Sequence, residues 1–158
     1  MDAMRELRPA YGFDDVAIVP GDVTINPELT DIGFSLGELT FPLPVVASAM
    51  DAVVDVQLAA ALSRLGGLAV MNLEGVQTRY DDPDAVLAEI AAAPDDQATA
   101  LIQEAYSRPI QERLAGERVR QLKAAGAVCA VSATPANTKR LAPLAVEAGP
   151  MSSWCSQR

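Results

Sequence analysis

The chain has 158 residues, of which 50% are hydrophobic and 21% are charged, and its net charge is -9 with a pI near 4.4. This length allows one domain with one core, and the composition is that of a folded chain rather than a disordered one. The acidic balance argues against a nucleic-acid partner or an anionic membrane surface. Because the sequence contains no run of apolar residues that predicts a membrane span or a secretory signal, we expect a cytoplasmic protein.

The sequence contains no histidine and two cysteines, Cys129 and Cys155. The lack of histidine excludes histidine-based catalytic triads, general bases and metal ligands, so we predict no metal site. Cys129 lies in the apolar segment 127–131, which is typical of a buried structural thiol. A disulfide is not expected in a cytoplasmic chain.

The N-terminal part of the chain predicts little regular structure. Residues 1–12 are expected to form a surface arm. Asp14 and Asp15 precede a short apolar segment, and on the residues alone they indicate a turn or a helix cap. Residues 21–40 are rich in Gly, Pro, Asp and Thr, which predicts extended segments and turns at the rim of a domain.

Two short apolar segments, 43–47 and 68–71, predict buried strands. A helical pattern lies between them, and strand, helix and strand within about thirty residues form a βαβ unit with parallel strands and a right-handed crossover. The carboxyl ends of the two strands therefore meet at the same edge of the sheet. This places Ser48 and Asn72, which follow the two strands, at that edge, where α/β folds bind ligands.

The helix between these strands is expected over residues 56–65. Asp55 is placed to cap its first turn, and Gly66-Gly67 to end it. Its leucines at 58, 62 and 65 fall on one side, which we interpret as the buried face.

The rest of the chain continues the alternation of strand and helix. Asp82 and Pro83 form a typical helix start. Thr134 is expected to cap a later helix, with Pro135 in its first turn. The expected elements are helices over 84–93, 95–106 and 111–125, a strand over 127–131 and a helix from Pro135 to 148.

Three segments, in this order and with fitting spacing, resemble motifs of the IMP dehydrogenase/GMP reductase family. Gly12–Val16 with Val19-Pro20 is similar to its TFDDV…VP opening, and residues 45–53 to its (I/V)-(V/S)-(S/A)-(A/P)-M-D-T-V loop. Residues 65–72 resemble its G-G-I-G-(F/V)-(I/L)-(H/N) strand. The continuation to Pro83 looks like the short branch without CBS domains, with a helical segment near 95–114 at the insertion point.

The resemblance implies a (β/α)8 TIM barrel that assembles as a homo-tetramer. It also implies oxidation of IMP to XMP with NAD, or reduction of GMP with NADPH in the reductase branch. We therefore expect an α/β fold in which residues 1–149 form the N-terminal portion of the barrel, with about three βα units and no closure.

The resemblance also implies site residues. Ser48 and Met50 match the positions that contact the purine nucleotide, with Met50 against the purine. Asp51 matches a position that supports the loop, since a carboxylate accepts backbone N–H bonds, and Asn72 is assigned the same supporting role. For Met50 alone, packing in the core is the plain alternative.

The chain departs from the family at the catalytic end. The Gly-rich nucleophile loop, G-x-G-P-G-(S/A)-x-C-T-T, and the Arg-Tyr flap do not occur in it, so we predict no catalytic residue and a truncated, inactive fragment. Residues 150–158 are polar where a fourth strand is expected. A shifted frame starting in codon 150 can encode apolar residues there, which gives the hypothesis of a frame-shifted tail. The sequence of the coding DNA tests it.

Two other hypotheses stay open. The chain can be a non-catalytic nucleotide-binding or assembly module that pairs with full-length homologues. It can also be a small flavodoxin-like α/β domain, although the long opening arm and the lack of a G-x-G-x-x-G phosphate loop argue against that.

Overall fold

The computed structural model describes residues 9–147 and divides the chain into two compact units, residues 1–31 and 32–158, which are described separately. The predicted tail at 150–158 and Cys155 lie outside the described residues. Among residues 9–147, no helix has both the length and the apolar character needed to cross a membrane.

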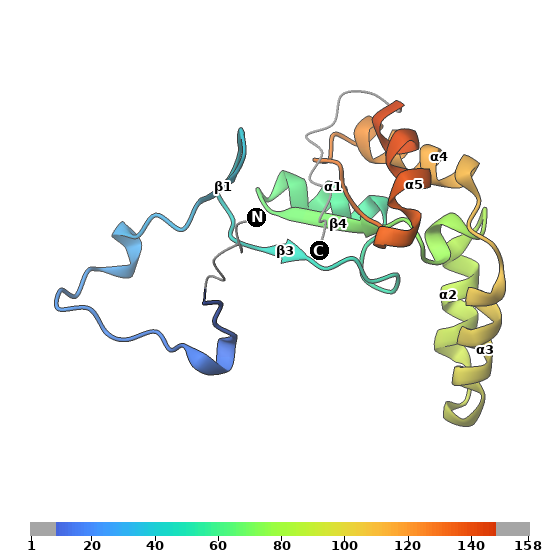
Figure 1. The fold of residues 1–158 in the computed structure, drawn as a ribbon, viewed down its shortest axis with the longest axis horizontal. Coiled ribbons are helices and arrows are strands. Elements are labelled where there is room, and N and C mark those ends of the chain that lie inside the picture. The colour runs from blue at the N-terminus through green and yellow to red at the C-terminus, as the bar shows by residue number, and fades with distance from the viewer. Residues whose placement is uncertain (1–8, 148–158) are drawn as a thin grey trace, which may run out of the picture. The chain divides into compact units, whose positions relative to one another are not determined.

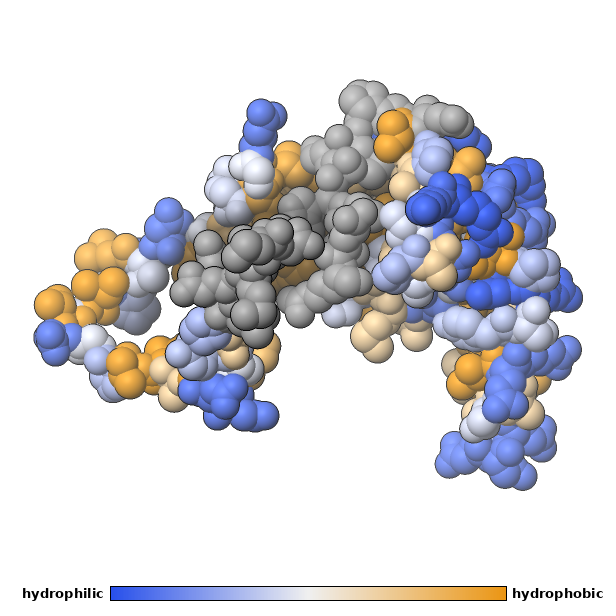
Figure 2. Space-filling model, viewed as in Figure 1, coloured by the Kyte–Doolittle hydropathy of each residue, from blue (hydrophilic) through white to orange (hydrophobic). Residues whose placement is uncertain are grey.

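The first unit is an arm with two single-turn 3-10 helices, η1 (Phe13–Asp15) and η2 (Pro27–Leu29). The carboxylate of Asp15 accepts the Gly12 N–H at 2.8 Å, so the expected capping role is confirmed for this residue. Every described residue of the arm is exposed, and its apolar residues form separate patches between hydrophilic ones (Figure 2). The arm therefore has no core of its own.

The second unit begins with an antiparallel hairpin. Strand β1 (Phe34–Leu36) pairs with β2 (Leu39–Phe41), and the Phe34 and Phe41 rings stack with their centroids 4.9 Å apart. Such a cross-strand aromatic pair stabilises a short hairpin that has few backbone hydrogen bonds.

Three parallel strands form the centre of the second unit, in the order β3-β4-β5 (Figure 1). Val46 of β3 (Val46–Ala47) pairs with Leu68 of β4 (Leu68–Asn72), and Val70 of β4 pairs with Ala130 of β5 (Ala130–Ser132). The predicted parallel βαβ unit is confirmed.

Two of the predicted strands have different bounds. β3 has two residues rather than five, because Pro44 has no N–H to donate and the Val45 N–H bonds to Leu43 O within the chain segment itself. β5 begins at Ala130 rather than 127, since the Ala127 N–H bonds to Leu122 O at the end of the preceding helix.

The helices occur close to their predicted positions. Their bounds are α1 (Val56–Arg64), η3 (Val76–Thr78), α2 (Pro83–Ala92), α3 (Asp95–Ser107), α4 (Glu112–Ala124) and α5 (Pro135–Glu147). Asp55 caps α1 by accepting the Leu58 N–H at 2.6 Å, and Asp82 caps α2 by accepting the Ala85 N–H at 3.1 Å. These two predicted caps are confirmed, whereas the hydroxyl of Thr134, the third predicted cap, donates to Glu74. α2 and α3 lie side by side as a helical hairpin beyond the end of the sheet (Figure 1).

The predicted buried face of α1 is wrong at two of its three leucines, whereas Leu62 is partly buried and packs against the core. Leu58 and Leu65 are 37% and 70% exposed, whereas Ala59 and Ala60 are buried. Small side chains on this face let the helix approach β4 closely.

The core lies between the sheet and helices α1, α4 and α5. It centres on Met71 and Leu73, with Val119 and Leu122 of α4 and Leu141 of α5 packed in the same cluster. All five side chains are at most 1% exposed. η3 also belongs to the interior, since Val76 and Thr78 are fully buried between the predicted strand at 68–71 and the predicted helix at 84–93.

The fold is thus an α/β arrangement of three βα units, and the described strands do not close into a barrel. The helical hairpin α2–α3 is inserted between β4 and α4. The carboxyl ends of β3, β4 and β5 share one edge, and the site is described from there.

Candidate functional site

The segment after β3 forms a tight turn. The Met50 N–H donates to Ser48 O at 2.7 Å, and the N–H groups of Val53 and Val54 donate to Met50 O at 3.0 and 2.9 Å. Val54 is buried and anchors the end of the turn. Ser48 and Met50 are exposed, with Met50 57% exposed. Met50 therefore does not pack in the core of the described residues, which was the alternative interpretation.

Asp51 is the buried charged residue of this turn, at 9% exposure. Its Oδ1 accepts the Asn72 side-chain amide at 3.2 Å, and its Oδ2 accepts the Val76 N–H at 2.8 Å and the Tyr106 hydroxyl. A carboxylate that accepts several hydrogen bonds is well compensated for its burial. Asp51 therefore joins the turn to the end of β4, to η3 and to α3.

Gly75 packs directly against this carboxylate. A Cβ atom at position 75 would lie 1.8 Å from Asp51 Oδ1, although the backbone of Gly75 has an ordinary φ of −94°. The glycine is thus required by space, because the carboxylate occupies the place of a side chain.

Glu74 ties the end of β4 to the end of β5. The Asn72 side-chain oxygen accepts the Glu74 N–H at 2.9 Å. The Glu74 carboxylate in turn accepts the Thr134 N–H, the Thr134 hydroxyl at 3.0 Å and the Asn137 amide. Burial raises the pKa of Glu74, but these hydrogen bonds outweigh it and hold the pKa below its usual value. Glu74 therefore stays ionised at neutral pH.

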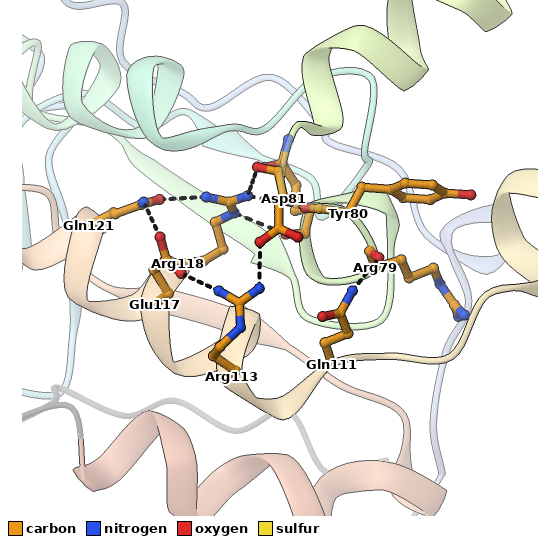
Figure 3. A network of polar contacts seen from close by, with 9 residues as sticks. Arg79, Tyr80, Asp81, Gln111, Arg113, Glu117, Arg118 and Gln121 are labelled. Atoms are coloured by element: carbon orange, nitrogen blue, oxygen red, sulfur yellow. Dashed lines mark hydrogen bonds and ion pairs between the residues drawn. The ribbon is translucent and has the colours of Figure 1, made fainter.

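A second buried charge, Arg118 of α4, fixes the loop that follows η3 (Figure 3). It is 7% exposed, and its guanidinium donates to the backbone carbonyls of Gln77 at 2.9 Å, Tyr80 at 3.3 Å and Asp81 at 3.1 Å. A further N–H donates to the Gln121 side chain at 2.9 Å. All of these partners are neutral acceptors, in η3, in the loop that follows it and on α4 itself.

Tyr106 lies at the C-terminal end of α3. Burial and the hydrogen bond to Asp51 raise its pKa from 10.0 to about 12, so its hydroxyl keeps its proton at neutral pH. The guanidinium of Arg79 lies 5.5 Å from the centroid of its ring, within the range of a cation–π contact. The hydroxyl is thus a permanent donor to the Asp51 carboxylate.

Cys129 is buried at 7% exposure and makes no disulfide. Burial raises the pKa of its thiol, which disfavours the reactive thiolate. The prediction of a structural thiol is confirmed, and among residues 9–147 no group of His, Cys, Asp or Glu side chains is arranged to hold a metal ion.

The family model described as "IMP dehydrogenase / GMP reductase domain" matches residues 10–145. The chain belongs to this family. The match includes the arm, both strand ends of the site and the helical hairpin α2–α3.

Similar proteins agree with this assignment. An uncharacterized oxidoreductase of Mycobacterium tuberculosis is 36% identical over 150 residues, which are 92% of this chain and 40% of the relative. The inosine-5'-monophosphate dehydrogenase of Methanocaldococcus jannaschii is 43% identical over 67 residues, 42% of this chain and 14% of the relative. A crystal structure of an IMP dehydrogenase/GMP reductase-like protein from Corynebacterium glutamicum matches with a TM-score of 0.79 and 30% identity, over 93% of this chain and 41% of that one.

The chain therefore spans about two fifths of the length of the oxidoreductases that match it along nearly all of its sequence. The α/β fold is that of part of an IMP dehydrogenase/GMP reductase-like barrel, as predicted.

The structure places all four predicted site residues in the turn after β3 and at the end of β4. Asp51 and Asn72 are hydrogen-bonded, and Met50 adjoins Asp51 in the turn, with Ser48 at the start of that turn. Sequence reasoning missed Glu74 and Tyr106. Glu74 comes three residues after the predicted strand 68–71, so a search for carboxylates shortly after each strand end finds it. Tyr106 gives no such signal, because it lies on a helix 55 residues from its partner.

Proposed function

We propose that this chain forms one wall of a purine-nucleotide site in an IMP dehydrogenase-type oxidoreductase. In this proposal the Ser48 hydroxyl binds the ribose or phosphate, and the polarisable Met50 thioether lies against the purine ring. Asp51 and Asn72 hold the turn in place. The observation that carries the proposal is the hydrogen bond from Asn72 to Asp51, which joins the ends of β3 and β4 while Ser48 and Met50 stay exposed beside it.

For the whole protein we propose oxidation of IMP to XMP with NAD, in the cytoplasm and as a homo-tetramer. Reduction of GMP with NADPH is the alternative, since the matching family includes both reactions. Nothing among residues 9–147 identifies a place for the nicotinamide cofactor, and the sequence has no G-x-G-x-x-G loop, so we assign no residue to it.

We further propose that these 158 residues catalyse no oxidation by themselves. The family's Gly-rich cysteine loop does not occur in the sequence, and Cys129 is buried with a raised pKa. The chain then acts as a nucleotide-binding or assembly module. The exposed Ser48 and Met50 favour this role, because they are available to a ligand without the cysteine loop.

Calorimetric titration of the purified chain with IMP tests the nucleotide site. We expect binding by the wild type, and a loss of affinity of about tenfold for Met50→Ala and for Ser48→Ala, the effect of one lost contact. Ser35→Ala is the matched control, because Ser35 is an exposed serine of β1 whose hydroxyl pairs with Thr40 at 3.3 Å.

Two outcomes would contradict the proposal. If circular dichroism shows that the wild-type chain is folded and the chain still does not bind IMP, the proposed nucleotide site is wrong. Formation of NADH when the purified chain is mixed with IMP and NAD removes the claim that the chain is inactive by itself.

A further inference from the structure

Tyr106 connects the helical hairpin α2–α3 to the turn at 48–54. It lies 55 residues along the chain from Asp51, yet its hydroxyl donates to Asp51 Oδ2. The same oxygen accepts the Val76 N–H at 2.8 Å. One carboxylate oxygen therefore holds α3 and η3 together.

The C-terminal end of α3 is fixed by several further contacts. Arg79, which faces the Tyr106 ring, donates from Nε and Nη2 to Glu74 O at 3.1 and 2.9 Å, and from Nη1 to Arg108 O. The Tyr80 hydroxyl donates to Ala105 O at 3.1 Å, and the guanidinium of Arg108 lies 4.7 Å from the centroid of the Tyr80 ring. The Tyr106 hydroxyl is thus presented to Asp51 from a helix end that several contacts hold in place.

A change in the position of the Asp51 carboxylate is passed to its neighbour Met50. The Met50 carbonyl accepts the N–H groups of Val53 and Val54, and the Met50 N–H donates within the same turn, so this turn has few independent degrees of freedom. Asp51 has no space to relax toward Gly75, where even a Cβ atom would be 1.8 Å from Oδ1. The hydroxyl of Tyr106 therefore limits where the turn can lie.

We propose that Tyr106 is a positioning residue for the turn at 48–54, acting through Asp51, so that the α2–α3 hairpin sets the conformation of the candidate nucleotide loop. The part of this inference that concerns nucleotide binding rests on the proposed function. Ordering of the turn by Tyr106 is independent of any ligand, and it can be measured separately.

The test uses Tyr106→Phe and the matched control Tyr80→Phe in the full 158-residue chain. Each variant loses one hydroxyl near the end of α3, but only Tyr106 contacts Asp51. Amide hydrogen exchange is followed by NMR at Val76, Val53 and Val54. We expect exchange about tenfold faster in Y106F, the effect of losing one hydrogen bond to a charged group. We expect a smaller change at these amides in Y80F, because Tyr80 contacts the end of α3 and not Asp51.

A double-mutant cycle separates positioning from a general loss of packing. If Tyr106 acts through Asp51, Y106F has no further effect on these amides in an Asp51→Asn background. Equal acceleration in Y106F and Y80F, or full additivity with D51N, overturns the proposal. So does a Y106F chain that loses its circular-dichroism spectrum while D51N keeps it, because Tyr106 would then act on the whole fold.

Titration with IMP links the positioning to function. We expect Y106F to bind IMP about tenfold more weakly than the wild type, and the loss of affinity in Y80F to be smaller than in Y106F. If the wild type binds IMP and Y106F binds equally well, the inference is wrong for the nucleotide loop. If the wild type does not bind IMP but the exchange results hold, the proposed function fails and Tyr106 still positions the turn.

Discussion

Asp51 and Arg118 are two buried charges that restrain neighbouring parts of the same segment, and they do so in different ways. Arg118 donates to three backbone carbonyls of the segment 77–81, so these acceptors are present whatever side chains that segment carries. Asp51 accepts from the side chains of Asn72 and Tyr106 as well as from the Val76 N–H, so its environment depends on the identity of residues in two separate elements, β4 and α3. The first arrangement stabilises a loop, whereas the second couples elements to the exposed turn.

Of the two buried charges, we expect Arg118 to contribute more to the free energy of unfolding. Arg118→Met leaves the buried carbonyl of Gln77 and the partly buried carbonyls of Tyr80 and Asp81 without their donor. We expect the free energy of unfolding to fall by about 3 kcal/mol, as for the loss of several buried hydrogen bonds. Urea denaturation followed by circular dichroism measures this, and a change below about 1 kcal/mol would show that the loop is held by other contacts.

The Asp51–Tyr106 pair predicts a loss of stability at alkaline pH. The pKa of Tyr106 is about 12 in the folded chain against 10.0 for an ordinary tyrosine, so the folded state binds the proton more tightly. This contribution to stability is complete below pH 10 and is lost as the pH rises through about 12. Ultraviolet titration should detect one of the three tyrosines ionising near pH 12.

Asp51→Asn is the control for this titration. It removes the charge and the charged acceptor, which are two of the causes that raise the pKa of Tyr106, so Tyr106 should ionise at a lower pH in the variant. An unchanged titration in D51N would mean that burial alone raises the pKa of Tyr106, and that the pair is weaker than the structure indicates.

The smallest effect is expected at Arg113, an arginine on the same helix as Arg118. Arg113 pairs with Asp81 and with Glu117 at 3.1 Å, but its side chain is 58% exposed. Exposed ion pairs contribute little to stability, because water screens them and two long side chains lose freedom. We expect Arg113→Ala to leave the urea midpoint unchanged, and a clear decrease would show that the pair with Asp81 helps to hold the loop.

Local rules account for the parts of the fold that the sequence predicts well. Asp55 and Asp82 were recognisable as caps because a cap needs only its own first turn, and the parallel βαβ unit follows from element order and chirality. That unit also placed Asn72 near the turn after β3. The lengths of β3 and β5 were not predictable in this way, because they depend on which N–H groups the neighbouring segments leave available.

Only the part of the candidate site that lies at the ends of the strands was predictable from the sequence. Motif resemblance and topology located Ser48, Met50, Asp51 and Asn72. Tyr106 depends on how the α2–α3 hairpin packs, and the buried face of α1 depends on how closely that helix approaches β4. Both are properties of tertiary packing, for which a periodic pattern of leucines is a poor guide.

Gly75 illustrates a different constraint on how this sequence can change. Any amino acid can adopt its φ, so its local backbone conformation does not require glycine. Yet even alanine would place a carbon atom inside the carboxylate of a residue 24 positions earlier. In a library of variants, substitutions at position 75 should therefore be tolerated only together with a smaller residue at 51. The two positions are expected to vary as a pair, and their covariation would report the contact between the ends of β3 and β4 without any structure.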